Sequence, residues 1–347
     1  MKRLLVSLAA LALTTVPFWA PTQTPAQAAP APAAANSSSL VVATYNVRCA
    51  NCSKHPVNKR EKRWNTRAAA IASTIAGEGI DLIGVQESSS GVLWKGGPAQ
   101  FEDLVNRLGA PYALTNGARY NCVRSTTPSS CDPAYQGASG DSRIIYNTNK
   151  LDLLAQGSLA LDDRKPGNGS ARFLAWAKFS ERATGKQFFF GTAHLEPGMS
   201  KAKIGKRAGQ ANAAIAELNR VSEGLPVIWG SDLASSKLSH SGNTAYDAFM
   251  AAGYTDPLGN SYKARTANAG TYAASMINEE YFTLNNFAKK PKKYAAYALG
   301  AHLDYILLKP QMQVLEWKQV LNLKSNGRFA GVIPSDHNLV KVTLVLP

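Results

Sequence analysis

Two segments near the end of the chain, His302-Leu303-Asp304-Tyr305-Ile306-Leu307-Leu308 and Ile333-Pro334-Ser335-Asp336-His337, determine how the rest is interpreted. The apolar, β-prone run 305–308 predicts a buried strand. Asp304 would open that strand, and a carboxylate beside a buried apolar run needs a partner. His337, the only histidine after His302, is the natural partner. A carboxylate that accepts a hydrogen bond from one imidazole nitrogen fixes the tautomer and makes the other nitrogen a better base.

Further polar residues accompany this pair. Asp336 could hold a hard cation beside the base. A single Asp-His pair is usually a solvated turn. The prediction of a site therefore depends on whether other strand ends carry further acids and histidines. Each of four more residues falls just past the end of an apolar run, and these are Asn46, Glu87, His194 and Asp232. Groups at strand ends are held rigidly on one rim, where ligand sites form. One alone would be a capped turn, but together they predict a site.

The hydrophobic pattern alternates between strands and helices, which predicts an α/β (α+β) fold. Strands are expected at 40–45, 80–85, 143–146, 173–179, 187–193, 225–229, 305–308, 314–317 and 339–346. Helices are expected at 64–75, 101–108, 204–218 and 246–251. No linker-like break interrupts the chain after Leu40, so one large domain is favoured over two.

The N-terminal segment has the pattern of a secretory signal peptide. Lys2 and Arg3 precede an apolar stretch, and Ala26-Gln27-Ala28 provides a small-residue cleavage site. A membrane anchor is the alternative, but two prolines interrupt the apolar stretch and no basic stop-transfer follows. We therefore predict a secreted, extracellular protein without a transmembrane segment in its mature form. The predicted divisions are a signal peptide at 1–28, a flexible leader at 29–39 and a single domain at 40–347.

The net charge of the chain is +15. The segment before Leu40 holds two basic and no acidic residues, which leaves 36 basic and 23 acidic residues, a net +13. In an exported protein this indicates a polyanionic partner, whether nucleic acid, an anionic membrane surface or a cell-wall polymer, with simple solubility as the alternative. The basic residues form three groups, at 59–63, at Lys201, Lys203, Lys206 and Arg207, and at 289–293.

The chain has four cysteines, and export predicts that they are oxidised. Local pairing, Cys49 with Cys52 and Cys122 with Cys131, is the simplest of the three possible connectivities. A zinc cage needs four donors close together, and a thioredoxin-type motif needs a helix after the first cysteine. Neither context is visible, so structural disulfides are predicted.

The carboxylates, the carboxamide and the two histidines at the strand ends suit one kind of chemistry. Oxygen donors without a cysteine cluster suit Mg²⁺, Mn²⁺ or Ca²⁺. Two imidazoles beside such an ion suit metal-assisted hydrolysis of a phosphoester, because one can deprotonate water while the other stabilises or protonates departing charge.

These motifs resemble those of the endonuclease/exonuclease/phosphatase superfamily, the group that includes deoxyribonuclease I, in the same order and over essentially the whole chain from Leu40. The matching segments are Tyr45-Asn46-Val47, Asp81-Leu82-Ile83-Gly84-Val85-Gln86-Glu87, Thr192-Ala193-His194-Leu195, Gly230-Ser231-Asp232, His302-Leu303-Asp304-Tyr305-Ile306 and Ser335-Asp336-His337. The resemblance implies a four-layer αββα sandwich of two mixed β-sheets flanked by helices, with the site at one rim.

The resemblance also implies roles for the site residues. Glu87 would bind the divalent metal, with Asn46 and Asp336 near it. His337, oriented by Asp304, would be the general base or would stabilise charge on the phosphate. His194 would be the second histidine, and Asp232 would position the attacking water. Phosphate contacts are expected from Asn46, Lys203 and Arg207.

One position departs from the family pattern. Where the family has Gly-Asp-x-Asn, this chain has Ser231-Asp232-Leu233-Ala234, and Ala234 lacks the donor that the Asn gives to the phosphate. Losing one such donor costs roughly 10² to 10³ in rate. The expected function is a nuclease that acts as a monomer. The alternatives are a sphingomyelinase-like enzyme, for which Val92-Leu93-Trp94 is a candidate lipid contact, another phosphatase, or a catalytically weak binding protein.

Overall fold

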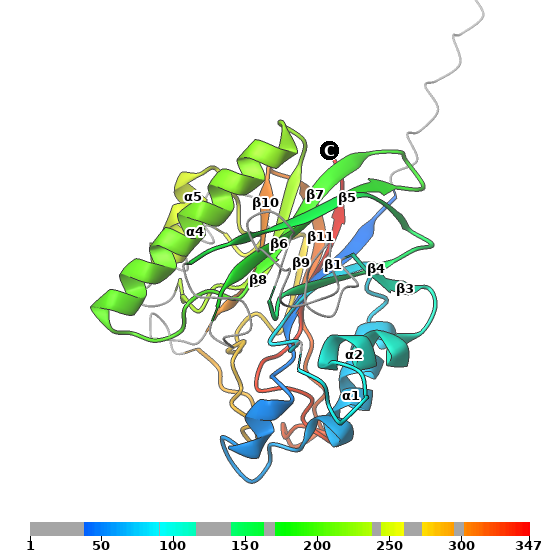
Figure 1. The fold of residues 1–347 in the computed structure, drawn as a ribbon, viewed down its shortest axis with the longest axis vertical. Helices are drawn as coiled ribbons and strands as arrows, with labels where there is room; N and C mark the ends of the chain where they lie inside the picture. The colour runs from blue at the N-terminus through cyan, green and yellow to red at the C-terminus, as the bar shows by residue number, and fades with distance from the viewer. Residues whose placement is uncertain are drawn as a thin grey trace, which may run out of the picture. The chain divides into compact units, whose positions relative to one another are not determined.

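The computed structural model describes residues 38–89, 91–115, 140–162, 171–237, 244–259, 273–294 and 302–347 (Figure 1). Asn36–Pro347 form one compact unit. Among the described residues, no helix has both the length and the apolar character needed to cross a bilayer. The division at residues 28 and 39 stays a prediction.

The larger sheet contains, within the described residues, seven strands in the order β3-β4-β2-β1-β12-β11-β9. Its strands are β1 (Leu40–Asn46), β2 (Leu82–Gln86), β3 (Tyr112–Leu114), β4 (Arg143–Asn147), β9 (Ser275–Ile277), β11 (Gln313–Gln319) and β12 (Val340–Val345). The central strand β1 runs parallel to β2 and antiparallel to β12. Asn46 pairs with Gln86 at the end of this register, so β1 and β2 end at the same rim.

The smaller sheet has five described strands in the order β10-β8-β7-β6-β5. They are β5 (Leu151–Ala160), β6 (Phe173–Glu181), β7 (Gln187–Ala193), β8 (Val227–Asp232) and β10 (Asp304–Lys309). The strands β7 and β8 are parallel, whereas β10 is antiparallel to β8. The first residue of β10, Asp304, therefore lies opposite the last residue of β8, Asp232.

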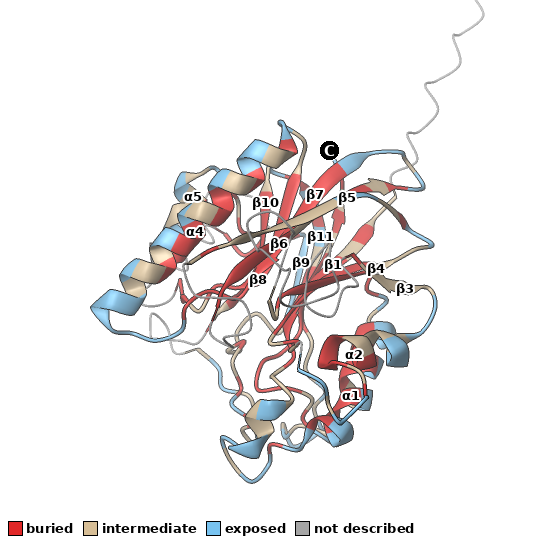
Figure 2. Cartoon of the chain, in the orientation of Figure 1, coloured by how far each residue is buried: buried red, intermediate tan, exposed pale blue. Residues whose placement is uncertain are grey.

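The two sheets pack face to face, with helices outside them (Figure 1). The buried core between the sheets includes Val42, Phe190, Ile228, Ile306 and Val342. The helices α1 (Trp64–Gly77) and α2 (Gln100–Leu108) pack against the larger sheet, and α4 (Lys201–Ser222) and α5 (Thr244–Ala251) pack against the smaller one. Figure 2 shows the strands between them as largely buried. The predicted four-layer αββα sandwich is confirmed.

Gly84 in β2 marks a place where the two sheets approach closely. A Cβ at this position would lie 2.5 Å from Thr192 Oγ1 and 2.7 Å from the carbonyl oxygen of Gly230. No real side chain tolerates such distances, so only glycine allows this approach. Next to it, Gln86 Nε2 donates to Thr192 Oγ1 at 2.8 Å. This bond joins β2 of one sheet to β7 of the other beside the rim.

The predicted strands and helices are all present, with small shifts at their ends. Three strands were not predicted, namely β3, β5 and β9. The short strands β3 and β9 have three residues each, too few to show a periodic pattern. The longer β5 lies at the edge of its sheet, and only its first residue is buried. An edge strand with half-exposed faces has little reason to alternate apolar and polar residues.

Candidate active site

Five strand ends meet at one rim and bring the predicted residues together. Asn46 ends β1, Asp232 ends β8 and Asp304 begins β10, while Glu87 and His194 directly follow β2 and β7. A cleft of about 430 Å³ opens at this rim, and its lining includes Glu87, His194, Asp232 and His337. The parallel pairs β1/β2 and β7/β8 explain the gathering, because parallel neighbours end on the same side.

Asp304 and His337 form a buried pair in the site. His337 Nδ1 lies 2.9 Å from Asp304 Oδ2, and the exposed fractions of the two residues are 6% and 0%. Thr283 Oγ1 holds the chain before Asp304 by accepting from the Leu303 N–H at 2.9 Å. A carboxylate can only accept, so the imidazole donates from Nδ1 and leaves Nε2 facing the cleft.

Neighbouring charges set the protonation of this pair. Burial lowers the pKa of His337, but the carboxylates of Asp304 and Asp232 outweigh burial and raise it well above its ordinary value. Burial raises the pKa of Asp304, and the nearby His337 counteracts this only in part. A histidine with a raised pKa carries a proton at neutral pH. His337 in this state suits stabilising or protonating an anionic group better than it suits removing a proton.

Asp232 lies between the two imidazoles. Its Oδ2 is 3.7 Å from His337 Nε2 and 3.6 Å from His194 Nε2. Burial raises the pKa of Asp232, but the two histidines, together with the Asn46 amide, lower it below its ordinary value. The same oxygen accepts from Asn46 Nδ2 at 3.1 Å. Asp232 is therefore an ionised carboxylate able to orient a polar group in the cleft.

His194 has a second carboxylate on its other side. Its Nδ1 is 3.9 Å from Asp141 Oδ2. Burial raises the pKa of Asp141, but His194 and then Arg172 outweigh burial and lower it. Each imidazole of the site thus faces Asp232 through Nε2 and another aspartate through Nδ1.

Glu87 and Asn46 form the opposite side of the cleft. Glu87 Oε1 accepts from Asn46 Nδ2 at 3.2 Å, and Oε2 accepts from the backbone N–H of Cys49 at 3.0 Å. The backbone of Glu87 has a φ of 56°, a left-handed conformation that is uncommon for residues with a side chain. Such strain is tolerated where the surrounding contacts fix a functional group. Asn46 links this side to Asp232 through the same amide.

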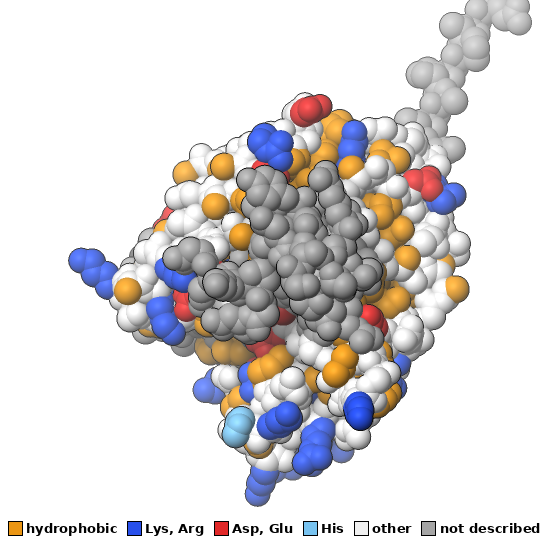
Figure 3. Space-filling model, viewed as in Figure 1, with side chains coloured by type: hydrophobic (Ala, Val, Ile, Leu, Met, Phe, Trp, Pro, Cys, Tyr) orange, Lys and Arg blue, Asp and Glu red, His pale blue; other side chains and the backbone are white. Residues whose placement is uncertain are grey.

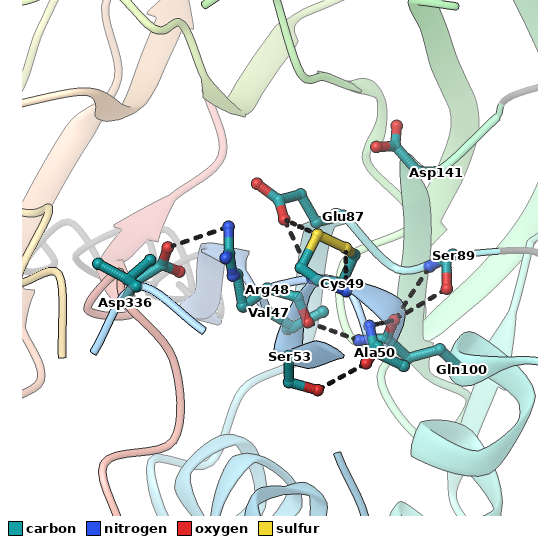
Figure 4. Close-up of a disulfide and its surroundings, with 12 residues drawn as sticks. Val47, Arg48, Cys49, Ala50, Ser53, Glu87, Ser89, Gln100, Asp141 and Asp336 are labelled. Atoms are coloured by element: carbon teal, nitrogen blue, oxygen red, sulfur yellow. Dashed lines mark hydrogen bonds and ion pairs between the residues drawn. A yellow bond between two sulfur atoms is a disulfide. The ribbon is translucent and has the colours of Figure 1, made fainter. Parts of the chain in front are cut away.

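Asp336 lies beyond Arg48 on the same side. The Arg48 guanidinium is 3.7 Å from Asp336 Oδ2, and Figure 4 shows it between the carboxylates of Asp336 and Glu87. Burial raises the pKa of Asp336, His337 lowers it, and the negative charge of Glu87 raises it further. Two carboxylates that repel one another beside a carboxamide match the oxygen donors that Mg²⁺, Mn²⁺ and Ca²⁺ prefer. Glu87 and Asp336 thus offer carboxylate oxygens of the kind that such a cation prefers, while Asn46 Oδ1 accepts from the Arg48 N–H at 3.0 Å.

A second group also places possible ligand atoms near one another. Oxygen and nitrogen atoms of Asp232, Asp304 and His337 lie within 4.8 Å of one another. His337, however, donates from Nδ1 to Asp304 and has a raised pKa. The atoms of this group that remain directed at the cleft are His337 Nε2 and Asp232 Oδ2, 3.7 Å apart.

The predicted Cys49–Cys52 disulfide is confirmed, with the two Cα atoms 5.2 Å apart. It closes the short 3₁₀ helix η1 (Asn51–Lys54) and lies against Glu87, whose Oε2 is 3.9 Å from Cys52 Sγ (Figure 4). The turn also presents the Cys49 N–H that Glu87 accepts from. Cys122 and Cys131 fall outside the described residues, so their pairing stays a prediction.

The predicted phosphate contacts on α4 have other neighbours. Lys203 is exposed and lies 3.9 Å from Glu196. The Arg207 guanidinium is buried and donates to the carbonyl oxygens of Glu196 at 2.6 Å and Gly198 at 2.9 Å. It therefore supports the loop that follows His194. This placement does not favour a direct substrate contact by Arg207.

Three charged residues of the site were not identified from the sequence: Arg48, Arg67 and Asp141. Arg67 is buried in α1, donates to the carbonyl oxygens of Val47 and Arg48, and reaches that of Pro334 at 3.2 Å. It therefore ties the loop after β1 to the segment that carries His337. A signal was present, because Arg67 interrupts the apolar face of the helix between Trp64 and Ile71. Arg48 and Asp141 had none.

Ala234 lines the cleft at the position where the family pattern has Asn. Its φ is 49°, a conformation that Asn adopts more readily than Ala. Its backbone N–H donates to Asp232 Oδ1 at 2.8 Å. The turn thus keeps the local shape and the contact to Asp232, although the side-chain donor is missing.

Comparison with known proteins gives a consistent result for the fold. No protein-family profile and no curated protein matches the sequence. An endonuclease/exonuclease/phosphatase family protein from Bacteroides thetaiotaomicron matches with a TM-score of 0.64 and 23% identity, over 90% of this chain and 99% of that one. The chain has the endonuclease/exonuclease/phosphatase fold. This confirms, at the level of the fold, the resemblance found in the motifs.

Two further structures with this fold differ in what they act on. The mannosyl-6-phosphatase of B. thetaiotaomicron matches with a TM-score of 0.62 and 23% identity, over 88% of this chain and 100% of that one. TDP2 of D. rerio, solved with a single-strand DNA product, matches with a TM-score of 0.56 and 16% identity, over 89% and 99%. The endonuclease/exonuclease/phosphatase fold thus serves more than one kind of phosphoester, and the substrate must be argued from this chain.

Proposed function

We propose that this protein is an exported, divalent-metal-dependent phosphoesterase that cleaves phosphodiester bonds of nucleic acid. The proposal rests on the two different sets of side chains that line opposite sides of the cleft. Glu87 and Asp336 supply carboxylate oxygens on one side, next to Asn46, whose Nδ2 donates to Glu87. On the other side, His337 and His194 flank the ionised Asp232. A phosphoester bound between them would meet both kinds of group.

The side chains divide the work of hydrolysis between them. His337, held by Asp304, presents a charged Nε2 that can donate to a phosphoryl oxygen. Asp232 is the acceptor that can orient a water molecule for attack. His194, whose Nε2 lies 3.6 Å from Asp232 Oδ2, is the second imidazole of the cleft and is assigned to the leaving oxygen. A divalent ion held by Glu87, Asn46 and Asp336 would supply positive charge that stabilises the phosphoryl oxygens.

Nucleic acid is the substrate class that the charge favours. The domain after residue 39 carries a net +13, and phosphate backbones are bound mainly through such charge. A phospholipid is the second candidate, because Trp94 and Val92 are 59% and 43% exposed and could enter a lipid surface. The catalytically weak alternative rests on Ala234.

A single set of assays separates these candidates. The secreted protein is incubated with plasmid DNA, RNA, sphingomyelin vesicles and 4-nitrophenyl phosphate, each with Mg²⁺, Mn²⁺ or Ca²⁺ and with excess chelator. We expect cleavage of nucleic acid that the chelator abolishes. Faster release of phosphocholine than of nucleotides would assign a lipid substrate. Binding without cleavage of any substrate would support the weak binding protein, and full activity in chelator would contradict the metal assignment.

A further inference from the structure

A basic groove lies on the surface next to the active-site loops. It has a volume of about 390 Å³, and its lining includes six cations: Lys59, Arg60, Lys62, Lys289, Lys324 and Arg328. All six side chains are exposed. Figure 3 shows Lys and Arg side chains gathered at the lower end of the molecule, where the segment after β1 lies in Figure 1.

The groove joins three segments that are far apart in the sequence. Asn58 Nδ2 donates to the carbonyl oxygen of Asn286 at 2.8 Å, and Arg60 Nε donates to that of Phe287 at 2.6 Å. The N–H of Phe329 donates to the carbonyl oxygen of Lys289 at 3.2 Å. These bonds bring the basic runs 59–63 and 289–293 together with a third pair of cations. The groove is therefore a product of the fold, built in part from two of the three basic groups in the sequence.

The positive charge of the groove is not neutralised. Glu61, the one acid of the first run, turns inward and accepts from Arg48 Nε at 3.1 Å and from the Val57 N–H at 2.7 Å. Within the described residues, none of the six cations forms an ion pair. The run on α4 differs, because Lys203 lies 3.9 Å from Glu196 and Lys206 lies 3.8 Å from Asp162.

Residues close to the groove in the sequence also contact the active-site segment. The backbone N–H groups of Asn285 and Asn286 donate to the carbonyl oxygen of Asp336 at 2.6 and 3.0 Å. Ile333 lines the groove four residues before His337. Arg48, whose guanidinium lies near Asp336, also bonds to Glu61 beside Arg60. The groove is therefore linked to the cleft through the Arg48–Glu61 ion pair and through the chain from Ile333 to His337.

We propose that the basic groove binds the phosphate backbone of a nucleic-acid strand whose scissile bond lies in the active-site cleft. The inference rests on the proposed function and adds a second contact region to it. Several unpaired cations along a hollow suit a chain of regularly spaced phosphates, and such contacts are independent of base sequence. A flat lipid surface would fit a hollow less well, and the exposed Trp94 lines another pocket, beside Trp64 and Arg107.

The test compares long and short ligands in matched variants. The variant Lys289→Gln/Lys324→Gln removes two cations from the lining of the groove, while Lys292→Gln/Lys201→Gln removes two exposed lysines outside it. Binding of a fluorescein-labelled 20-nucleotide single-stranded DNA is measured by anisotropy in excess chelator, across a salt series. Hydrolysis of bis(4-nitrophenyl) phosphate, which has a single phosphodiester and no polymer backbone, is measured in Mg²⁺.

The groove variant should bind the oligonucleotide roughly tenfold more weakly at 0.15 M salt, and the slope of log affinity against log salt should fall by about 1.4, or 0.7 for each lost contact. Hydrolysis of the short ester should be unchanged, and the control variant should behave as wild type. Equal losses in both variants, or no loss in either, would overturn the proposal. So would a groove variant that loses binding only to phosphatidylserine vesicles.

This design separates the two proposals. Because binding is measured in chelator, it does not depend on catalysis. If the protein cleaves no nucleic acid but the groove variant loses oligonucleotide binding, the proposed function fails and the groove stands. If nucleic acid is cleaved and the groove variant binds as wild type, the proposed function stands and the groove proposal fails.

Discussion

Asp232 and Asp336 are both buried aspartates of the same rim, with exposed fractions of 2% and 5%, yet their pKa values move in opposite directions. Two imidazoles outweigh the burial of Asp232 and lower its pKa. Burial raises the pKa of Asp336, and the charge of Glu87 adds to this effect. The difference shows that the partners, and not the depth of burial, decide what each carboxylate can do. Two imidazoles flank Asp232, whereas Asp336 lies near one imidazole, the Arg48 guanidinium and the competing carboxylate of Glu87.

The largest expected effect comes from the imidazole side. His337→Ala removes the charged Nε2 and should lower turnover of a phosphodiester by roughly 10² to 10⁴. The Mg²⁺ concentration for half-maximal activity should stay near the wild-type value, because the opposite side is untouched. Steady-state kinetics across a Mg²⁺ series measures both quantities. A large shift in the Mg²⁺ midpoint with unchanged turnover would assign His337 to the metal side.

Glu87→Gln should show the reverse pattern. It removes an anionic ligand while keeping a similar shape, so the Mg²⁺ midpoint should rise by at least the roughly 10 to 100-fold that disturbed metal sites show. The fold should be retained, because Glu87 is only partly buried. Isothermal titration with Mg²⁺ and the melting temperature test the two statements separately. Unchanged metal affinity would remove Glu87 from the ligand set.

Removing the Cys49–Cys52 disulfide should have a smaller effect, also on the side of the cleft that holds Glu87. Cys49→Ser/Cys52→Ser should lower the free energy of unfolding by about 2 kcal/mol, by the loop-entropy relation for so short a loop. It should also weaken Mg²⁺ binding, since the turn presents the Cys49 N–H to Glu87. Urea unfolding and metal titration measure these changes, with Ser53→Ala in the same turn as the control. A stability loss without any change in metal binding would limit the disulfide to a structural role.

The smallest effect is a dependence of stability on pH. The pKa of His337 is raised on folding, so its protonation stabilises the native state. That contribution is complete below about pH 6.5, the value for an unfolded histidine, and is lost as the pH rises through the folded-state pKa. In chelator, the difference in melting temperature between wild type and His337→Gln should therefore shrink above pH 6.5. A difference that grows with pH would contradict the charged His337.

Much of the fold follows from the sequence because apolar runs and their spacing depend on local residues. The polar residues at the ends of β1, β2, β7 and β8 could be placed for the same reason. Arg48 and Asp141 could not, because their importance depends on tertiary neighbours, Asp336 and His194, that no local pattern reveals. Arg207 shows the opposite failure, since its place in a basic run led to the prediction of a phosphate contact while the fold buries it.

The charge of the basic runs also depends on tertiary neighbours. The sequence shows three of them but does not show which are neutralised. The run on α4 meets Glu196 and Asp162, whereas Glu61 in the first run turns away toward Arg48. Only the folded chain separates a neutralised run from a groove with free charge.

The central claim is that Asp304 and His337 act as one unit on the imidazole side of the cleft. The most direct measurement is turnover of bis(4-nitrophenyl) phosphate at saturating Mg²⁺ for Asp304→Asn, His337→Ala and the double variant, each normalised to folded protein. Residues that act together have non-additive effects. The double variant should therefore be hardly slower than His337→Ala alone. Rate losses that multiply, or turnover near wild type in both single variants, would contradict the claim.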